Sequence, residues 1–396
     1  MRKKPLVLIV AGDHHGNLGD KAIVSATADM IRGRLEDPQL CLVGGGSQTY
    51  WSEHGVELIP GGQRGLARQL GVARRSDLVI CGGGGLFQDD DSRVKMPYWA
   101  AHLALIRPLA RRLVGFAIGA GPLKHASSRR CAAFALRRLD SVSVRDALAK
   151  RVLAPLSDKP ITVVPDPALC LTPARAELGD AVLAKHGVPL DGRPLIGVAV
   201  RRWFHLRSQL IPHKYASRFR LRRIPGTAQH NELISLVAQA LDRLVAEHAA
   251  HIVFLPTYNV AHEGDDFVSE CIVERMHAAA AACVIRIEDP HLYKRIAGRL
   301  SVMFAARMHA AILAASMGTP VVTLSYNPKF QGFLGHIDGH AGALTIEEFV
   351  TRRAIDELTE QLRTALAERV SEHTIAALQS SVERHLASVL MQARLG

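Results

Sequence analysis

Three side chains with the chemistry to hold and protonate an anion occur close together in the chain: Arg307, His309 and Lys329. Arginine can grip a carboxylate or phosphate through two parallel N–H bonds, and histidine gains or loses a proton near neutral pH. Residues 310–317 have helix-forming composition and precede Gly-Thr-Pro, so residues 321–324 are expected to form a buried strand. Arg307 and His309 then lie at a helix start, where exposed backbone N–H groups favour an anion, and Lys329 follows the next strand.

An isolated Arg-x-His more often has a structural role, with the arginine solvated and the histidine hydrogen-bonded within its helix. The functional interpretation therefore depends on the residues at other strand ends. In open α/β sheets the carboxyl ends of parallel strands share one rim, and ligands bind there.

Two glycine-rich loops follow strands in the first half of the chain. The first, at residues 12–23, contains Asn17, Gly19 and Asp20, and the second, at residues 82–85, is four consecutive glycines. Glycine lets a backbone turn tightly and approach a ligand. The first loop lacks the Gly-x-Gly-x-x-Gly pattern of dinucleotide binders and the Gly-Lys-Ser/Thr of a P-loop, and a tight turn with Asp20 as helix cap explains most of it.

Charged residues also follow the ends of other predicted strands. Arg145 follows one of them, where it is either an anion clamp or the ion-pair partner of Asp146 or Asp166. Asp166 stands between two prolines, which favours a turn or cap over a catalytic acid. The three aspartates at 89–91 are a poor magnesium site, because consecutive side chains point in different directions, and no metal site is expected.

Strand-length apolar runs alternate with helical stretches along the chain, which is typical of parallel βαβ units and an α/β fold. They fall into two series, separated by a break near residues 171–193, and the pattern after residue 344 is purely helical. We therefore expect an N-terminal domain at 1–180, a second domain at 181–345 and a helical tail at 346–396. Strands are expected near 5–11, 39–43, 77–81, 113–118, 140–144 and 161–164, then near 194–200, 251–255, 283–287, 301–304 and 320–324.

The formal net charge of +12 is concentrated in one segment. Residues 201–224 hold eight Lys or Arg, two histidines, four aromatic residues and no Asp or Glu. Such a segment can meet an anionic membrane surface or an acidic polysaccharide, or it can be a solvated loop that serves solubility. Nucleic acid is the least favoured partner, because no helix-turn-helix, zinc-finger or RNP-like pattern accompanies the charge.

The six cysteines indicate a reducing compartment, since they lie mostly within apolar runs without Cys-x-x-Cys spacing. The apolar run at residues 6–11 is short and ends in Gly-Asp-His-His, which favours a core strand over a signal peptide. No other segment offers the roughly 18 consecutive apolar residues of a membrane span. The sequence predicts a cytoplasmic protein, with peripheral contact at the inner membrane face if segment 201–224 binds lipid.

Six motifs, in order and over roughly residues 5–335, resemble the polysaccharide pyruvyl transferase family. Each is weak alone, whereas six in order are specific. They are Asn-Leu-Gly-Asp at 17–20, Asp-Leu-Val-Ile at 77–80 leading into Gly-Gly-Gly-Gly-Leu-Phe-Gln-Asp at 82–89, Val-Arg-Asp at 144–146, Pro-Asp-Pro at 165–167, Arg-Met-His at 307–309 and Tyr-Asn-Pro-Lys at 326–329. The resemblance implies a GT-B-like fold, in which two Rossmann-like domains with parallel sheets face each other across a cleft that holds the active site.

The resemblance also implies a reaction. Members of that family move the enolpyruvyl unit of phosphoenolpyruvate onto sugar hydroxyls of a cell-surface or exported glycan, form a pyruvate ketal and release phosphate. The donor is a substrate, so no cofactor is expected, and the acceptor is expected to be a glycan or lipid-linked oligosaccharide.

Site residues follow from the same resemblance. It assigns phosphoenolpyruvate binding to Arg145 and Lys329 with Arg307 assisting, which suits a ligand with a carboxylate and a phosphate. His309, as the only motif residue that titrates near neutrality, is expected to be the general acid/base. Five residues of the glycine loops are expected to shape the floor of the donor or acceptor pocket: Asn17, Gly19, Asp20, Gly83 and Gly84.

Two other functions remain open at this point. A GT-B glycosyltransferase using a nucleotide sugar shares the architecture, although that class commonly places an acidic residue on the donor ribose and residues 307–329 contain no Asp or Glu. A non-catalytic protein could instead hold an anionic polymer through segment 201–224.

Overall fold

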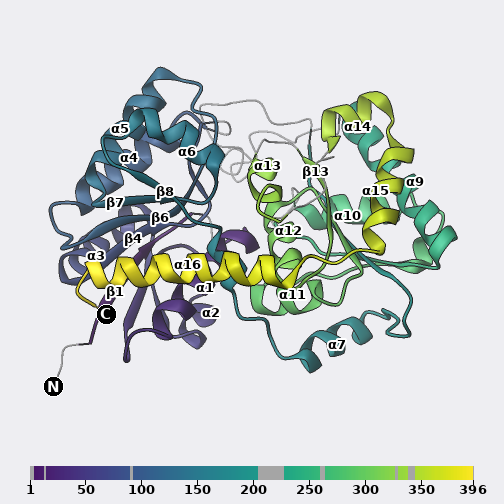
Figure 1. Cartoon of the computed structure of the whole chain (residues 1–396), viewed down its shortest axis with the longest axis horizontal. Helices are drawn as coiled ribbons and strands as arrows, with labels where there is room; N and C mark the ends of the chain where they lie inside the picture. The colour runs from purple at the N-terminus through teal and green to yellow at the C-terminus, as the bar shows by residue number, and fades with distance from the viewer. Residues whose placement is uncertain are drawn as a thin grey trace.

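Two parallel sheets of Rossmann type organise the chain (Figure 1). The computed structural model describes residues 4–12, 15–89, 92–203, 227–258, 264–325, 329–337 and 344–395. The sheets span residues 6–163 and 195–345, within the predicted domains 1–180 and 181–345. Helix α7, Ala176–Lys185, lies in the connection between them.

The first sheet has the strand order β3-β2-β1-β4-β6-β7-β8, with the short β5 paired to β6. Every pairing is parallel. Its strands are β1 Leu6–Val10, β2 Gln39–Gly44, β3 Val56–Pro60, β4 Leu78–Gly82, β5 Gly85–Phe87, β6 Leu113–Ala120, β7 Ser141–Val144 and β8 Ile161–Val163. Its helices are α1 Leu18–Arg32, α2 Gln48–Glu53, α3 Gly62–Arg75, α4 Lys95–Ile106, α5 Ala126–Arg138 and α6 Ala147–Leu153, with short 3₁₀ turns η1 Ala154–Leu156 and η2 Pro167–Cys170.

The second sheet has the order β11-β10-β9-β12-β13-β14, again all parallel. The order reverses between β9 and β12, as it does between β1 and β4 in the first sheet, and such switch points bind ligands in this architecture. Its strands are β9 Leu195–Ala199, β10 His251–Phe254, β11 Ala282–Val284, β12 Val302–Ala305, β13 Val321–Ser325 and β14 Leu344–Thr345. Its helices are α9 Ala228–His248, α10 Asp265–Val273, α11 Pro290–Ala297, α12 Met308–Ala315, α13 Lys329–Leu334, α14 Ile346–Arg352 and α15 Ile355–Leu366, with the 3₁₀ turn η3 Ala279–Ala281.

The central strands form because their residues are apolar without interruption. Every residue of β1, β4, β9 and β13 is buried. Helices cover both faces of a parallel sheet, so its strands lose the polar–apolar alternation of a half-exposed sheet. This is the pattern that predicted the two strand series.

The elements that the sequence pattern missed are short or peripheral. Strand β3 is an edge strand with two exposed residues, β5 has three residues and begins at the last glycine of the second loop, and β14 has two residues. Strand β11 ends at Val284, earlier than the predicted strand at 283–287. These strands carry too little apolar sequence to stand out from the loops around them.

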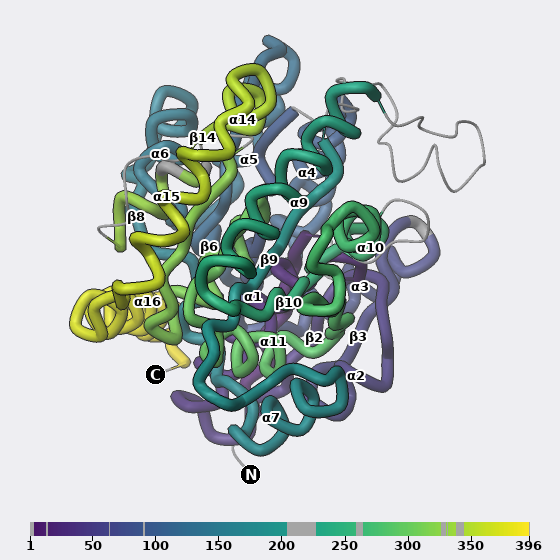
Figure 2. The backbone as a smooth tube through the Cα atoms, turned by 90° about the vertical axis from the view of Figure 1, so that its right-hand side faces the viewer, coloured from purple at the N-terminus to yellow at the C-terminus, as the bar shows by residue number. Residues whose placement is uncertain are grey.

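The C-terminal helices serve both domains. Helices α14 and α15 pack beside α9 on the second sheet (Figure 2). Helix α16, Glu372–Gln392, then runs across to the first domain, where Val382, Leu386 and Val389 join the core formed by β1, β2 and β4 (Figure 1). Among the described helices, none combines the length and the apolar character needed to cross a membrane.

The docking of α16 gives a stability prediction. Leu386 is fully buried against the first domain, so Leu386→Ala should lower the free energy of unfolding by about 2–5 kcal/mol. Met391 lies on the same helix and is 62 % exposed, so Met391→Ala should change it by less than about 0.5 kcal/mol. Urea denaturation of both variants measures the difference, and equal stabilities would show that α16 is not packed as described.

Candidate active site

The carboxyl ends of strands from both sheets meet around one carboxylate, Asp166. From the first domain, Arg145 follows β7 and Asp166 follows β8, whereas His309 lies in the first turn of α12 in the second domain. Arg145 Nη1 lies 3.3 Å and His309 Nε2 lies 3.6 Å from the same atom, Asp166 Oδ2. The structure thus brings together three residues that the sequence separates by up to 164 positions (309 − 145).

Asp166 is held by its own backbone as well as by Arg145 and His309. Its Oδ1 accepts a hydrogen bond of 3.0 Å from the N–H of Ala168 and so caps η2, as its position between two prolines predicted. Its side chain is 4 % exposed. The prediction of a cap and the alternative prediction of an Arg145–Asp166 ion pair therefore both hold, for the same carboxylate.

The electrostatics of the site keep Asp166 ionised. Burial alone would raise the pKa of the Asp166 carboxyl, but His309, then Arg145 and the Ala168 N–H outweigh burial and leave the pKa below its ordinary value. Asp166 therefore carries a full negative charge at neutral pH. When His309 is protonated, this carboxylate faces a positive charge from each domain.

Arg145 has donors to spare for an anion. Its guanidinium is 5 % exposed and makes one hydrogen bond to a described side chain, from Nη1 to Asp166, while Nε lies 3.6 Å from Asp146 Oδ2. The buried Nε has no hydrogen-bond partner among the described residues. Since a guanidinium offers five N–H donors, most of its capacity is unused by described residues. The group packs against Gly119, where a Cβ would lie 2.9 Å from Arg145 Cζ.

The first glycine loop positions His309. A Cβ on Gly19 would lie 2.0 Å from His309 Nδ1, so only glycine lets the start of α1 lie against this ring. Asn17 caps α1 by accepting a hydrogen bond of 3.0 Å from the Gly19 N–H. The next residue, Leu18, donates its N–H to the carbonyl of Thr257 in the second domain at 2.9 Å. The loop therefore joins the domains next to His309.

The second glycine loop packs against the first. Gly83 and Gly84 have φ of 89° and 74°, in the left-handed region that favours glycine. A Cβ on Gly84 would lie 2.2 Å from Oδ1 of Asp20, which is buried in the first turn of α1. Asp20, Gly83 and Gly84 thus form the contact between the two loops.

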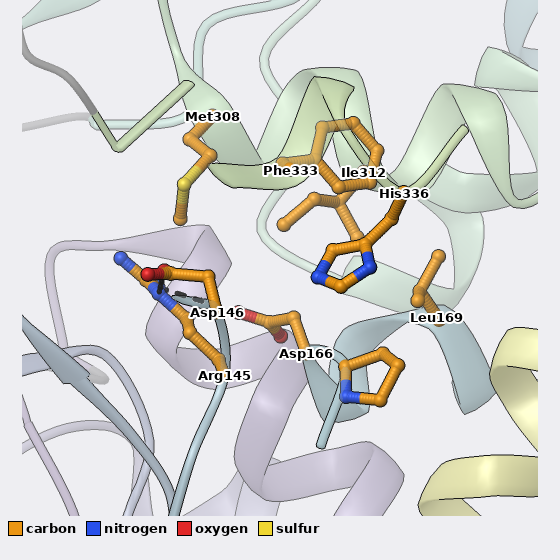
Figure 3. A pocket seen from close by; sticks show the side chains of 9 residues that line it. Arg145, Asp146, Asp166, Leu169, Met308, Ile312, Phe333 and His336 are labelled. Atoms are coloured by element: carbon orange, nitrogen blue, oxygen red, sulfur yellow. Dashed lines mark hydrogen bonds and ion pairs between the residues drawn. The ribbon is translucent and has the colours of Figure 1, made fainter. Parts of the chain in front are cut away.

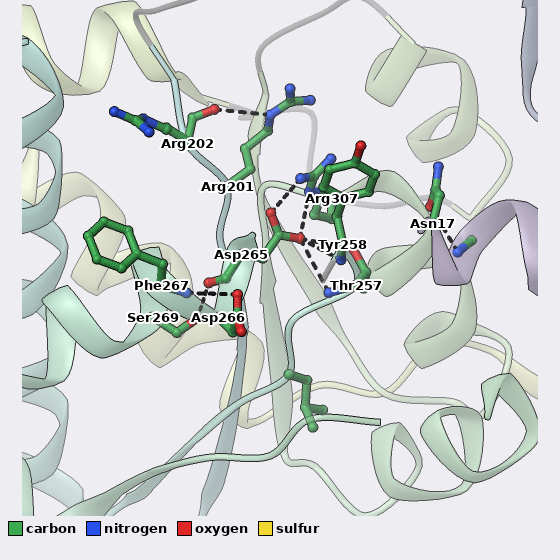
Figure 4. Close-up of polar contacts among 12 residues, drawn as sticks. Asn17, Arg201, Arg202, Thr257, Tyr258, Asp265, Asp266, Phe267, Ser269 and Arg307 are labelled. Carbon is green, nitrogen blue, oxygen red and sulfur yellow. Dashed lines mark hydrogen bonds and ion pairs between the residues drawn. The ribbon is translucent and has the colours of Figure 1, made fainter. Parts of the chain in front are cut away.

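Arg307 forms an ion pair with a carboxylate of its own domain, the second. It precedes α12 and binds Asp265 through two parallel contacts, with Nε 2.8 Å from Oδ2 and Nη2 bonded to Oδ1. Asp265 is fully buried and also accepts from the backbone N–H of Thr257 and Tyr258, at 3.3 and 3.0 Å (Figure 4). Arg307, which the sequence predicted to bind an anionic substrate, thus pairs with the carboxylate of Asp265 on α10. The sequence motifs did not include Asp265.

Lys329 begins α13, but its side chain and residues 326–328 lie outside the described part of the chain. Helix α13 itself borders the site. A Cβ on Gly332 would lie 2.9 Å from the Cβ of Asp146, the residue after Arg145. The helix that Lys329 opens therefore packs directly against the strand end that carries Arg145.

A small pocket lies at this junction, and residues of both domains line it (Figure 3). One side is polar and the other is apolar. The lining residues are Arg145, Asp146, Pro165, Asp166, Leu169, Met308, Ile312, Phe333 and His336.

His336 is a titratable pocket residue that the sequence did not indicate. Burial lowers its pKa, against the opposing effect of Asp146, so it is neutral at pH 7. Its Nε2 is buried and lacks a hydrogen-bond partner among the described residues. No motif surrounds His336 in the sequence, so only the turn after α13 reveals its place in the site.

Comparison with solved structures defines the class as GT-B-like. UDP-GlcNAc 2-epimerase from Methanocaldococcus jannaschii superposes with a TM-score of 0.61 at 11 % identity, covering 98 % of this chain and 99 % of that one. E. coli ADP-heptose LPS heptosyltransferase II gives 0.54 at 14 %, covering 92 % and 98 %. A glycosyltransferase from Rickettsia africae gives 0.57 at 10 %, covering 99 % of both. At these identities the likeness extends to the fold alone.

The family follows from the sequence match. The model of the polysaccharide pyruvyl transferase family matches residues 17–328, so the chain belongs to that family and is an enzyme of it. No curated protein sequence matches the chain. The predicted fold class and the resemblance to this family are both confirmed.

The contact between Gly19 and His309 can be tested by adding one methyl group. Gly19→Ala should displace the His309 ring and lower the free energy of unfolding by about 1–3 kcal/mol through overpacking. Gly71 lies in α3 with open space around it, so Gly71→Ala should raise stability by about 0.5–1 kcal/mol. Urea denaturation compares the two, and a fully stable Gly19→Ala variant would contradict the close contact.

The pairing of Asp166 has a predictable pH dependence. Folding lowers the pKa of the Asp166 carboxyl. Its contribution to the free energy of unfolding is therefore fully present above the unfolded pKa of about 3.9 and is lost as the pH falls through the folded pKa. Asp166→Asn should therefore cost about 3–5 kcal/mol at pH 7, and this difference from the wild type should shrink below about pH 4. Urea denaturation from pH 7 to pH 3 measures it. The exposed Asp191, replaced by Asn, is the control, and a cost that did not change with pH would contradict the ionised pair.

Proposed function

We propose that the protein transfers the enolpyruvyl unit of phosphoenolpyruvate to two hydroxyls of a sugar in a cell-surface or exported glycan, forming a pyruvate ketal and releasing phosphate. Family membership supports a pyruvyl transfer onto a polysaccharide. The observation that carries the finer proposal is the convergence of Arg145 and His309 on Asp166, since it combines an anion-binding group and a proton donor from two domains.

In this proposal Arg145 holds an anionic group of phosphoenolpyruvate with its unused N–H donors, Lys329 neutralises further negative charge, and Arg307 assists from the second domain. Asp166 orients Arg145 and His309 and keeps both charged groups in place. The apolar side of the pocket, with Met308 and Phe333, limits water around the reacting carbon. The contacts of Asn17, Gly19, Asp20, Gly83 and Gly84 suit residues that shape the floor of the pocket.

The chemistry requires one proton donor and two hydroxyl nucleophiles. His309 gives a proton to the methylene carbon of phosphoenolpyruvate, and positive charge develops at the adjacent carbon, which the first sugar hydroxyl attacks. Loss of phosphate then regenerates positive charge at that carbon for attack by the second hydroxyl. The two hydroxyl protons leave, one returning to His309 and one to the departing phosphate, so the ring closes as a ketal.

The acceptor in this proposal is a lipid-linked or polymeric glycan at the cytoplasmic face of the membrane, and the protein is cytoplasmic with peripheral membrane contact. The basic segment 201–224 provides the charge for that contact. Most of it, residues 204–224, lies outside the described residues. Its first part is held to the second domain, since Trp203 Nε1 donates to Glu347 at 2.6 Å.

The alternative, a nucleotide-sugar glycosyltransferase, needs an acidic residue available to the donor ribose. The nearest acid to Arg307 in the second domain is Asp265, which is fully buried and already bound by Arg307 and two backbone N–H groups. This favours phosphoenolpyruvate. A thermal-shift comparison separates the two donors, since the bound one raises the melting temperature.

The proposal predicts that His309 is essential for turnover. With phosphoenolpyruvate and a panel of glycan acceptors, the protein should release phosphate and yield a product heavier by a pyruvate ketal. His309→Ala should lower kcat by about 10²–10⁴-fold without unfolding the protein. His186, exposed on α7 and remote from the pocket, is the matched control: His186→Ala should retain wild-type turnover. Full activity of His309→Ala would remove the acid/base role.

A further inference from the structure

A second cluster of ligating side chains lies where the two domains meet, outside the lining of the Asp166 pocket. It consists of His54, at the end of α2 in the first domain, and Asp289 and His291, at the start of α11 in the second. One ligand atom from each residue lies within 4.8 Å of the others. The motifs of the sequence gave no sign of it, because His54 is far from the other two residues in the chain.

Backbone hydrogen bonds orient both imidazoles in the same way. His54 Nδ1 lies 2.8 Å from the carbonyl of Tyr50, and His291 Nδ1 lies 2.7 Å from the carbonyl of Thr172. A carbonyl oxygen only accepts, so both Nδ1 atoms carry the hydrogen and the neutral rings present their lone pairs at Nε2. Metal-bound histidines are held by this kind of bond at the other ring nitrogen.

The rings have the spacing of two ligands on one ion. The rings are stacked, with centres 5.3 Å apart and planes inclined by only 14°, so each ring must turn for both Nε2 lone pairs to point at one ion. Two imidazoles on a tetrahedral Zn²⁺, with Zn–N bonds of about 2.1 Å, would have centres about 5 Å apart. Nε2 of His291 is buried and has no hydrogen-bond partner among the described residues.

Charged groups of both signs surround the two rings. The Asp289 carboxylate accepts the backbone N–H of His291 at 2.9 Å, which fixes it beside the rings. Asp29 pairs with Arg32, whose Nη1 lies 3.4 Å from Asp29 Oδ1 and whose Nη2 donates to the carbonyl of His54, so a carboxylate and a guanidinium both lie near the rings. The Lys21 ammonium also lies near the cluster: its Nζ donates to the carbonyl of Glu288 at 2.8 Å, lies 3.4 Å from the centre of the Tyr50 ring and interacts electrostatically with Asp289.

We propose that His54, Asp289 and His291 bind a divalent transition-metal ion, one per chain, with Zn²⁺ as the best-matched probe. Two imidazole nitrogens and one carboxylate form a three-residue ligand set that Zn²⁺ accepts, with water in the fourth position. Since the ligands come from both domains, the ion ties α2 of the first to α11 of the second. The site is independent of the pyruvyl transfer proposed above.

Zinc binding to the untagged, metal-free full chain tests this proposal. Isothermal titration with ZnCl₂ should show one equivalent bound with a dissociation constant in the micromolar range or below, and zinc should raise the melting temperature. His291→Ala and His54→Ala, one from each domain, should each weaken binding at least tenfold and remove the thermal shift. The control is His186→Ala, because His186 makes the same Nδ1-to-carbonyl contact, to Val182 at 2.9 Å, on an exposed helix end.

The outcome discriminates this cluster from other ligands in the chain, such as the six cysteines. Absence of binding by the wild type overturns the proposal. Equal affinity of the wild type and of either folded cluster variant, checked by circular dichroism without metal, also overturns it, since the ion would then bind elsewhere.

Discussion

The buried carboxylate of Asp166 is the constraint on which the rest of the structure depends. An ionised group out of water is very costly unless it is paired, and the partners of Asp166 come from different domains, Arg145 from the first and His309 from the second. Satisfying that charge therefore fixes how the two Rossmann-type domains meet. The same pairing sets the Arg145 guanidinium in the wall of one pocket and the His309 imidazole on the other side of Asp166, so the interaction that orients the domains also brings these two groups together.

Glycines in the surrounding loops allow the side chains of the site to pack closely against the backbone. Gly19 removes the side chain that would collide with the His309 ring, and Gly84 does the same for Asp20 in the neighbouring loop. Helix α1 inserts between the domains, where Leu18 and Ile23 share one apolar cluster with Met308 and Ile312 of α12. Burial of this apolar surface stabilises the contact, because transfer of apolar groups from water is favourable wherever the domains close on each other. These glycines therefore help to position the side chains of the site, although they are neither charged nor reactive.

The sequence predicted the core of this arrangement and missed its edges for physical reasons. Parallel strands covered on both faces are continuously apolar, so the central strands were visible, whereas β3, β5 and β14 are short or marginal. Arg145 and His309 were predicted as site residues because each follows a strand or starts a helix, whereas the prolines around Asp166 predicted only a cap. Asp265, His336 and the His54–His291 pair were not predicted, since their importance depends on side chains that meet only after folding. For Arg307 the sequence indicated a ligand for an anion, and the structure adds Asp265 as its partner, a role that spacing alone does not reveal.

The most direct test of the central claim is a crystal structure of the chain with phosphoenolpyruvate bound. Phosphoenolpyruvate is expected to lie in the Asp166 pocket, with one of its anionic groups on the guanidinium of Arg145 and its methylene carbon facing Nε2 of His309. Asp166 is expected to stay between these two residues. Phosphoenolpyruvate bound elsewhere, with Arg145 and His309 making no contact to it, would contradict the claim that one buried carboxylate joins the domains and assembles the donor site.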